Sequence, residues 1–301
     1  MKAVVTGGAG FIGSHLARAL LDAGYETHVV DNLVSGRRED VPEGAHFHEL
    51  DILETAKLHA VVSGADVVFH LAALPRVTFS FDYPAESHRA NIDGTMSVLM
   101  ACREGKVRRV VYAGSSSSYG DQEKLPFTED MRSNPLSLYA LQKYVGEELM
   151  RLFSLNYGLE TVSLRFFSVY GPHMRPDGAY ALALPKFLAA KKAGKPLTIT
   201  GDGSQTRDFT HVKDVTRACL LAATKDTVGK GKMLNIAAGR NVSVNTLAEM
   251  IGGEKEYVAP RAGDAKDTWG DTTKAKELLG WEPEVSLEEG IAELEREYTN
   301  L

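Results

Sequence analysis

The sequence predicts an α/β fold built on a doubly wound parallel sheet, with a smaller C-terminal α/β lobe. Two observations carry this prediction. Short β-rich runs alternate with helix-length amphipathic segments through the first half of the chain, and these runs are mostly apolar on both faces. Strands of a parallel sheet that helices cover on both sides have this composition, and such alternation is typical of βαβ units.

The predicted elements of the first half are each bounded by polar or glycine positions. In chain order, strands are expected at residues 2–6, 26–31, 46–50, 66–70, 108–113 and 160–166. Helices are expected at residues 11–23, 56–62, 87–103 and 138–157. The first 170 residues are therefore predicted to form one sheet with its covering helices.

After about residue 171 the alternation becomes irregular. A stretch that contains glycine and proline, 171–178, leads into a helix expected at 179–191, and the last helix is expected at 287–297. Mixed short strands and helices lie between them. We expect a larger lobe over residues 1–170 and a smaller substrate-binding lobe over 171–301, interleaved and with an approximate boundary.

Composition excludes several classes of partner. A formal net charge of −6 gives no electrostatic reason to expect nucleic acid or an anionic membrane. No uncharged run approaches the ~20 residues that span a bilayer, and no leader precedes the first strand. Cys102 and Cys219 lie far apart in apolar helical segments, outside any metal-binding spacing. The sequence therefore predicts buried free thiols, no metal site and a cytoplasmic protein.

A glycine-rich turn, GGAGFIG at 7–13, follows the first predicted strand and opens the first helix. Glycines let the backbone approach a pyrophosphate closely, and the helix start offers free N–H groups. A strand that ends in Asp31 lies about 20 residues further on, as a dinucleotide site requires. Asp31 can accept hydrogen bonds from ribose hydroxyls and would repel a 2′-phosphate, so NAD is favoured over NADP. Arg37 and Arg38 would weaken that repulsion.

A serine-rich run, GSSSSYG at 114–120, precedes a Tyr-x-x-x-Lys motif at Tyr139 and Lys143. An i,i+4 spacing places the phenol and the ammonium on one helix face. A phenol with a pKa near 10 is a poor base at neutral pH, but an adjacent cation stabilises the phenolate. Tyr139 is therefore expected to exchange a proton with a substrate hydroxyl, with a serine hydroxyl hydrogen-bonded to the same oxygen.

These motifs, in this order and over essentially the whole chain, resemble those of the extended short-chain dehydrogenase/reductase family. The resemblance implies a Rossmann-like fold, NAD as cofactor, and Ser115 as the active serine beside Tyr139 and Lys143. The cofactor-binding residues that it implies are Gly7, Gly10, Phe11, Ile12, Gly13, Asp31, Asn32, Ser35, Gly36, Asp51, Ile52, Leu71, Ala72, Ala73, Asn91, Tyr139, Lys143 and Phe166.

Within that family the chain most resembles UDP-glucose 4-epimerases and their N-acetylhexosamine and glucuronate relatives. Sugar 4,6-dehydratases carry an Asp-Glu pair where Ser116 and Ser117 stand, so dehydration is set aside. The resemblance implies 4-epimerisation of a UDP-sugar through a transient 4-keto intermediate, with UDP-glucose and UDP-galactose first and UDP-N-acetylhexosamine next. UDP-glucuronate 4-epimerisation or decarboxylation is an alternative, and a non-catalytic NAD-binding regulatory protein is a second one.

The resemblance also implies a set of substrate-binding residues. They are Ser116, Ser117, Ser168, Arg207, Arg261, Asp264 and Thr268. Arg207 and Arg261 would clamp the diphosphate, because the planar guanidinium binds two phosphate oxygens at once. Ser168 stands where hexose epimerases carry an asparagine and glucuronate epimerases a small hydroxyl residue. Thr268 stands where a large residue narrows the hexose pocket, and would admit an N-acetyl group. A homodimer through helices 87–103 and 138–157 is implied as well.

Overall fold

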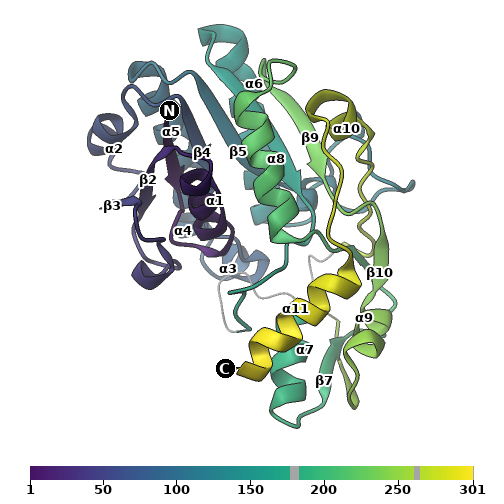
Figure 1. The fold of residues 1–301 in the computed structure, drawn as a ribbon. Helices are drawn as coiled ribbons and strands as arrows, with labels where there is room; N and C mark the ends of the chain where they lie inside the picture. The colour runs from purple at the N-terminus through teal and green to yellow at the C-terminus, as the bar shows by residue number, and fades with distance from the viewer. Residues whose placement is uncertain (177–182, 261–264, 301) are drawn as a thin grey trace.

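A seven-stranded parallel sheet forms the centre of the molecule (Figure 1). The computed structural model describes residues 1–176, 183–260 and 265–300. The strand order is β3-β2-β1-β4-β5-β6-β9. The strands are β1 Lys2–Thr6, β2 Glu26–Asp31, β3 His46–Glu49, β4 Val67–His70, β5 Arg109–Ser115, β6 Glu160–Phe166 and β9 Lys232–Ile236. The first six agree with the expected strands to within two residues at each end.

Helices cover both faces of this sheet, which confirms the doubly wound fold. One face packs on α1 (Phe11–Asp22), α8 (Val212–Thr224) and α10 (Thr273–Leu279). The other packs on α2 (Thr55–Val62), α5 (Gly94–Glu104) and α6 (Leu138–Tyr157). Both layers are built from Val, Leu, Ala and Ile side chains that are almost completely buried, so the strands are apolar on both faces as the sequence indicates.

A separate cluster of buried residues lies beyond the carboxyl edge of the sheet, where Figure 1 shows α7, α9 and α11 together. Its elements are α7 Ala183–Lys192, β7 Leu197–Thr200, β8 Thr206–Asp208, β10 Asn241–Ser243, α9 Val244–Ile251, β11 Lys255–Val258 and α11 Leu287–Asn300. β10 pairs with β8 antiparallel, and β11 pairs with β7 parallel. Residues 179–182 of the helix expected at 179–191 lie outside the described residues.

Three features of the fold differ from the sequence prediction. Strand β9 and helix α8 come from the second half of the chain yet belong to the central sheet and its cover. The helix expected at 87–103 is instead α4 (Pro84–His88), a single π-turn (Arg89–Asp93) and α5 in succession. Short elements that were not expected are α3 (Val77–Asp82) and the 3₁₀ turns Arg38–Asp40 and Ser116–Tyr119. The π-turn at Arg89–Asp93 belongs to a rare class of structure that occurs often at functional sites.

Within the described ranges, no helix is both long and apolar enough to cross a membrane. The two cysteines are buried free thiols, as expected.

Candidate active site

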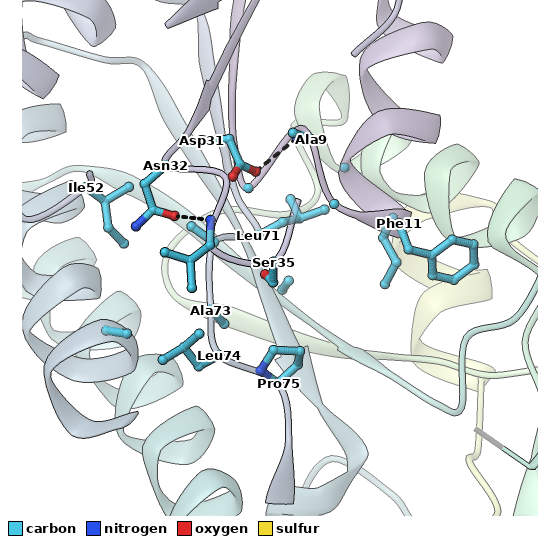
Figure 2. Close-up of a pocket in the computed structure, with 18 of the residues that line it drawn as sticks. Ala9, Phe11, Asp31, Asn32, Ser35, Ile52, Leu71, Ala73, Leu74 and Pro75 are labelled. Atoms are coloured by element: carbon cyan, nitrogen blue, oxygen red, sulfur yellow. Dashed lines mark hydrogen bonds between the residues drawn. The ribbon is translucent and has the colours of Figure 1, made fainter. Parts of the chain in front are cut away.

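A cavity of about 1070 Å³ opens along the carboxyl edge of the sheet. Its walls come from the turns that follow β1, β2, β4 and β5, from α6, and from the segment 169–175. Figure 2 shows how Asp31, Asn32 and Ser35 face Leu71, Ala73 and Leu74 across it. The crevice outside the carboxyl ends of parallel strands is where doubly wound folds bind their ligands.

The glycine turn after β1 forms one end of the cavity, and its glycines are required by close approach. Gly7 has φ 73°, and a Cβ there would lie 2.6 Å from the backbone nitrogen of Ala72. A Cβ at Gly13 would overlap the carbonyl oxygen of Gly7. Gly10 caps α1 without a side-chain hydrogen bond, and the first residues of the helix line the cavity, so N–H groups that no side chain satisfies lie at its wall. This end of the cavity fits a pyrophosphate.

Asp31 lies at the end of β2 and ties the neighbouring turns together. Its carboxylate accepts a hydrogen bond from the Ala9 N–H at 3.0 Å (Figure 2) and another from the Leu33 N–H at 2.8 Å. Burial raises the pKa of Asp31, and these two hydrogen bonds oppose the rise. Asn32 donates to the Asp51 carboxylate at 2.9 Å, so the two turns expected to hold the adenosine end are linked.

The Tyr-x-x-x-Lys motif lies on the buried face of α6, next to the carboxyl end of β5. Lys143 Nζ donates a 2.9 Å hydrogen bond to the carbonyl oxygen of Ala113. Burial raises the pKa of Tyr139 to about 12, opposed by a hydrogen bond with the Ser115 side chain. Burial lowers the pKa of Lys143 to about 8, opposed by the negative charge of Glu147. Serine, tyrosine and lysine thus meet at one point of the cavity wall.

Glu147 was not predicted as a site residue. It lies on α6 with Tyr139 and Lys143 and acts on this group without lining the cavity. Its buried carboxylate pairs with the buried guanidinium of Arg165 on β6 through hydrogen bonds of 2.6, 2.9 and 3.1 Å. The pair places a fixed negative charge one helical turn from Lys143 on α6. Glu147 is hard to recognise as a buried residue from the sequence, because a single glutamate on a helix is usually exposed.

Most of the expected cofactor-binding residues line the cavity. They are Gly7, Gly10, Phe11, Ile12, Gly13, Asp31, Asn32, Ser35, Asp51, Ile52, Leu71, Ala72, Ala73, Tyr139, Lys143 and Phe166. Gly36 packs on Ala9, where a Cβ would come within 2.9 Å of it. Asn91, in the π-turn, lies behind the wall: it accepts a hydrogen bond from Leu74 N–H at 2.8 Å and donates to Gln142 Oε1 at 2.7 Å. Asn91 therefore fixes the turn after β4.

The expected sugar-binding residues that the structure describes lie at several separate places in the fold and are not among the residues that line the cavity. Ser117 Oγ lies 2.7 Å from Ser115 Oγ, and Ser116 precedes it in the same 3₁₀ turn. Ser168 has a positive φ of 21°, and asparagine is enriched among non-glycine residues with positive φ. Arg207 donates to the carbonyl oxygen of Thr206 at 2.8 Å, and Thr268 is buried behind β8. Arg261 and Asp264 lie outside the described residues.

Charged residues that were not predicted also line the cavity. Arg175 Nη2 lies 3.3 Å from Asp40 Oδ2, which joins the segment after β6 to the segment after β2 across the cavity mouth. Arg76 and Arg89 contribute two further guanidinium groups to the wall. No motif spacing connects residues this far apart in sequence, so only the fold could bring them together.

Comparison with known proteins places these features among sugar-nucleotide enzymes. A family model described as the NAD dependent epimerase/dehydratase family matches residues 3–237. A putative UDP-glucose 4-epimerase of Methanocaldococcus jannaschii is 37% identical, over 96% of this chain and 95% of the relative.

Two solved structures are similar over nearly their whole length. One is a UDP-glucose 4-epimerase with UDP-glucose from Thermotoga maritima, at 39% identity and a TM-score of 0.93, covering 100% of this chain and 99% of that one. The other is a UDP-glucuronic acid 4-epimerase from Bacillus cereus with UDP-glucuronic acid and NAD, at 33% identity and a TM-score of 0.92. It covers 100% of this chain and 99% of that one.

Proposed function

The chain belongs to the NAD dependent epimerase/dehydratase family, and from that premise we propose that it catalyses the 4-epimerisation of a UDP-sugar. The observation that carries the proposal is the meeting of Ser115, Tyr139 and Lys143 at the wall of a cavity whose far end is a glycine-lined pyrophosphate cradle. A proton-transfer group and a dinucleotide site thus share one space, as hydride chemistry at a sugar carbon requires.

The residues present fit NAD. Gly7, Gly10 and Gly13 would hold its pyrophosphate, and Asp31 its adenosine ribose. Tyr139 and Lys143 would face its nicotinamide half. Bound NAD supplies a hydride acceptor and donor at C4 of the sugar.

Side chains of the protein transfer the proton of the C4 hydroxyl. Tyr139, as the phenolate that the charge of Lys143 stabilises, takes the proton of the C4 hydroxyl and becomes a neutral phenol. The phenol returns this proton to the C4 oxygen when the ketone is reduced, which restores the phenolate. Ser115, hydrogen-bonded to Tyr139, holds the reacting oxygen in place as it changes from alcohol to ketone and back. Because hydride leaves and returns to the same carbon, no net oxidation occurs and no external reductant is needed.

UDP-glucose and UDP-galactose are the first proposed substrates. The similarity to enzymes named UDP-glucose 4-epimerase supports this choice. UDP-glucuronate is a second candidate, favoured by the small hydroxyl residue Ser168 and by the similarity to a UDP-glucuronic acid 4-epimerase. UDP-N-acetylhexosamine is a third candidate, supported by the small residue Thr268 at a position where the family resemblance implies that a large residue would narrow the hexose pocket.

We further propose that the enzyme is a cytoplasmic homodimer. Apolar side chains of α6 and of the preceding α5 lie exposed on the outside of the sheet's cover, among them Met96, Leu141, Leu152 and Leu155. Leu155 is the most exposed of these, at 71%. Free buried thiols suit a reducing compartment. We also retain the division into two interleaved lobes near residue 170 as a proposal.

The test of the reaction is incubation of the purified protein with UDP-glucose, UDP-N-acetylglucosamine and UDP-glucuronate, without reductant, followed by chromatographic product analysis. Formation of a 4-epimer from one of them supports the proposal and ranks the substrates. Loss of carbon dioxide from UDP-glucuronate would identify a decarboxylase instead. No conversion with NAD added would overturn the proposal in favour of a non-catalytic NAD-binding protein.

A further inference from the structure

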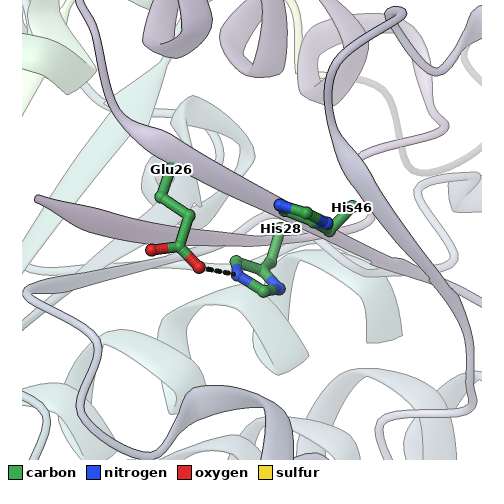
Figure 3. A group of neighbouring side chains, drawn as sticks. All are labelled: Glu26, His28 and His46. Atoms are coloured by element: carbon green, nitrogen blue, oxygen red, sulfur yellow. Dashed lines mark hydrogen bonds and ion pairs between the residues drawn. The ribbon is translucent and has the colours of Figure 1, made fainter.

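Two histidines and a glutamate gather on one face of the outermost strand pair, β2 and β3 (Figure 3). Glu26 and His28 stand two residues apart on β2, so both side chains leave the same face. His46 lies opposite His28 in the parallel register. His48 follows two residues after His46 and contacts His28 as well. None of these residues takes part in the proposed reaction.

The ligand atoms of Glu26, His28 and His46 already lie near one another. One such atom from each residue falls within 4.8 Å of the other two. His28 Nε2 lies 3.0 Å from Glu26 Oε1, and the rings of His28 and His46 stack with centroids 4.7 Å apart. Ligands of one tetrahedral ion at about 2.0–2.2 Å bonds are separated by about 3.3–3.5 Å. Small rotations of the two exposed side chains, Glu26 and His46, would bring all three atoms to that separation.

We propose that Glu26, His28 and His46 form a binding site for a divalent transition-metal ion such as Zn²⁺. Two imidazoles and a carboxylate suit Zn²⁺, Ni²⁺ or Cu²⁺ rather than Mg²⁺, which takes mainly oxygen ligands. A water molecule completes a tetrahedral shell, because the site is open to solvent on the side of Glu26, whose side chain is 59% exposed.

His48 positions the central ligand. Its Nε2 lies 2.9 Å from His28 Nδ1, on the side of the ring away from Glu26. When His28 Nε2 binds a metal, its Nδ1 carries the ring proton and needs an acceptor, which neutral His48 provides.

The charges around the site are compatible with a cation. The carboxylate of Glu26 contributes one negative charge and lies 3.0 Å from His28 Nε2. Lys2, paired with Glu26 in the register, opposes a cation, but its Nζ is directed to the carbonyl oxygens of Val61 and Ser63 at 2.7 and 3.0 Å.

The site lies at the opposite end of β2 from the cofactor cavity. Glu26 begins the strand and Asp31 ends it, a span of about 16 Å. A metal there would fasten the edge strand β3 to β2 and stabilise the fold without touching the reaction. A metal site was not predicted from the sequence, because these ligands come from two separate strands and match no single-segment motif.

The experiment is a calorimetric titration of the tag-free full chain with Zn²⁺ after chelator treatment, with Mg²⁺ as comparison. We expect one Zn²⁺ per chain, no binding of Mg²⁺, and a thermal midpoint that rises with Zn²⁺ concentration. Glu26→Gln and His46→Ala should each weaken Zn²⁺ binding at least tenfold and abolish the midpoint shift. His48→Phe should weaken it by about 10–100-fold.

The matched control is His88→Ala, which removes an exposed histidine on α4 that lies outside the cluster. This variant should bind Zn²⁺ as the parent does. Circular dichroism shows whether each variant is folded, and Glu26→Gln, which changes one exposed atom group, guards against a loss caused by misfolding. Equal Zn²⁺ binding by the parent and His46→Ala, or no binding by the parent, would overturn the proposal.

Discussion

The ammonium of Lys143 on α6 is bound at 2.9 Å to the carbonyl oxygen of Ala113, two residues before Ser115 on β5. This contact joins the helix that carries the tyrosine to the strand that carries the serine. It also holds a cation in a buried position, where its charge acts on neighbouring groups more strongly than in water.

Removal of the Tyr139 hydroxyl should stop proton transfer and leave the fold intact. Tyr139→Phe should lower kcat by about 10³-fold, because general acid–base groups contribute about 10²–10⁴-fold. The matched control is Tyr144→Phe, the same change on the same helix, which should keep parental kcat. A Tyr139→Phe enzyme with near-parental kcat would contradict the role of this residue.

The pH profile should report the charge of Lys143. Its pKa is lowered to about 8 by burial, so the ammonium is present below that pH and lost as the pH rises through it. We expect kcat/KM to fall above about pH 8 in a profile from about pH 6 to about pH 10.

The Glu147→Gln variant tests the role of the Lys143 ammonium in a second way. It removes the negative charge that raises the pKa of Lys143 and should move the falling limb to lower pH. Circular dichroism must first show that the variant folds, because loss of the Glu147 carboxylate leaves the buried Arg165 without its partner. A kcat/KM that keeps rising to pH 10 in the parent would argue against a catalytic ammonium.

Asp31 should set the choice between NAD and NADP. Asp31→Ala removes an acceptor for the ribose hydroxyls and the charge that repels a 2′-phosphate. We expect the Kd for NAD to rise about tenfold or more, as loss of a charged hydrogen bond implies, and the preference for NAD over NADP to narrow. Fluorescence titration with both cofactors measures the two effects. An equal loss for both would mean that Asp31 acts only through Ala9 and Leu33.

His70 should make the folded protein sensitive to acid. It is fully buried between Thr6 Oγ1 at 2.8 Å and Thr95 Oγ1 at 2.9 Å, and burial lowers its pKa to about 3. The unfolded chain, with a pKa near 6.5, binds the proton first, so stability is lost as the pH falls below about 6.5. The loss amounts to about 2 kcal/mol between pH 7 and pH 5.

His70→Gln isolates this effect, because glutamine does not titrate. The difference in the free energy of unfolding between the parent and this variant should shrink by about 2 kcal/mol from pH 7 to pH 5. Urea denaturation at the two pH values measures it. A difference that stays constant would show that His70 is not the group responsible.

The sequence predicted best where local pattern and position act together. The turn at Gly7, the strand end at Asp31 and the Tyr139–Lys143 spacing each have a mechanism that is legible in a short segment, and all of them line the cavity. Strand β9 was missed because its pairing with β6 joins segments about seventy residues apart, after an irregular stretch.

Residues that act through tertiary contacts were also missed. The Arg175–Asp40 pair and the Glu147–Arg165 pair each join different elements, and either partner alone resembles an ordinary surface charge in the sequence. The cluster at Glu26, His28 and His46 depends on the register of two strands, which the sequence alone does not fix.

In the proposed reaction, hydride leaves C4 of the sugar and returns to the same carbon from the opposite side. The most direct test of this route uses UDP-glucose, or whichever UDP-sugar the protein converts, labelled with deuterium at C4. Product analysis by NMR and mass spectrometry should find the 4-epimer with the deuterium retained at C4, without added reductant. Exchange of the label with solvent, or no 4-epimer from any of the three UDP-sugars, would contradict the account.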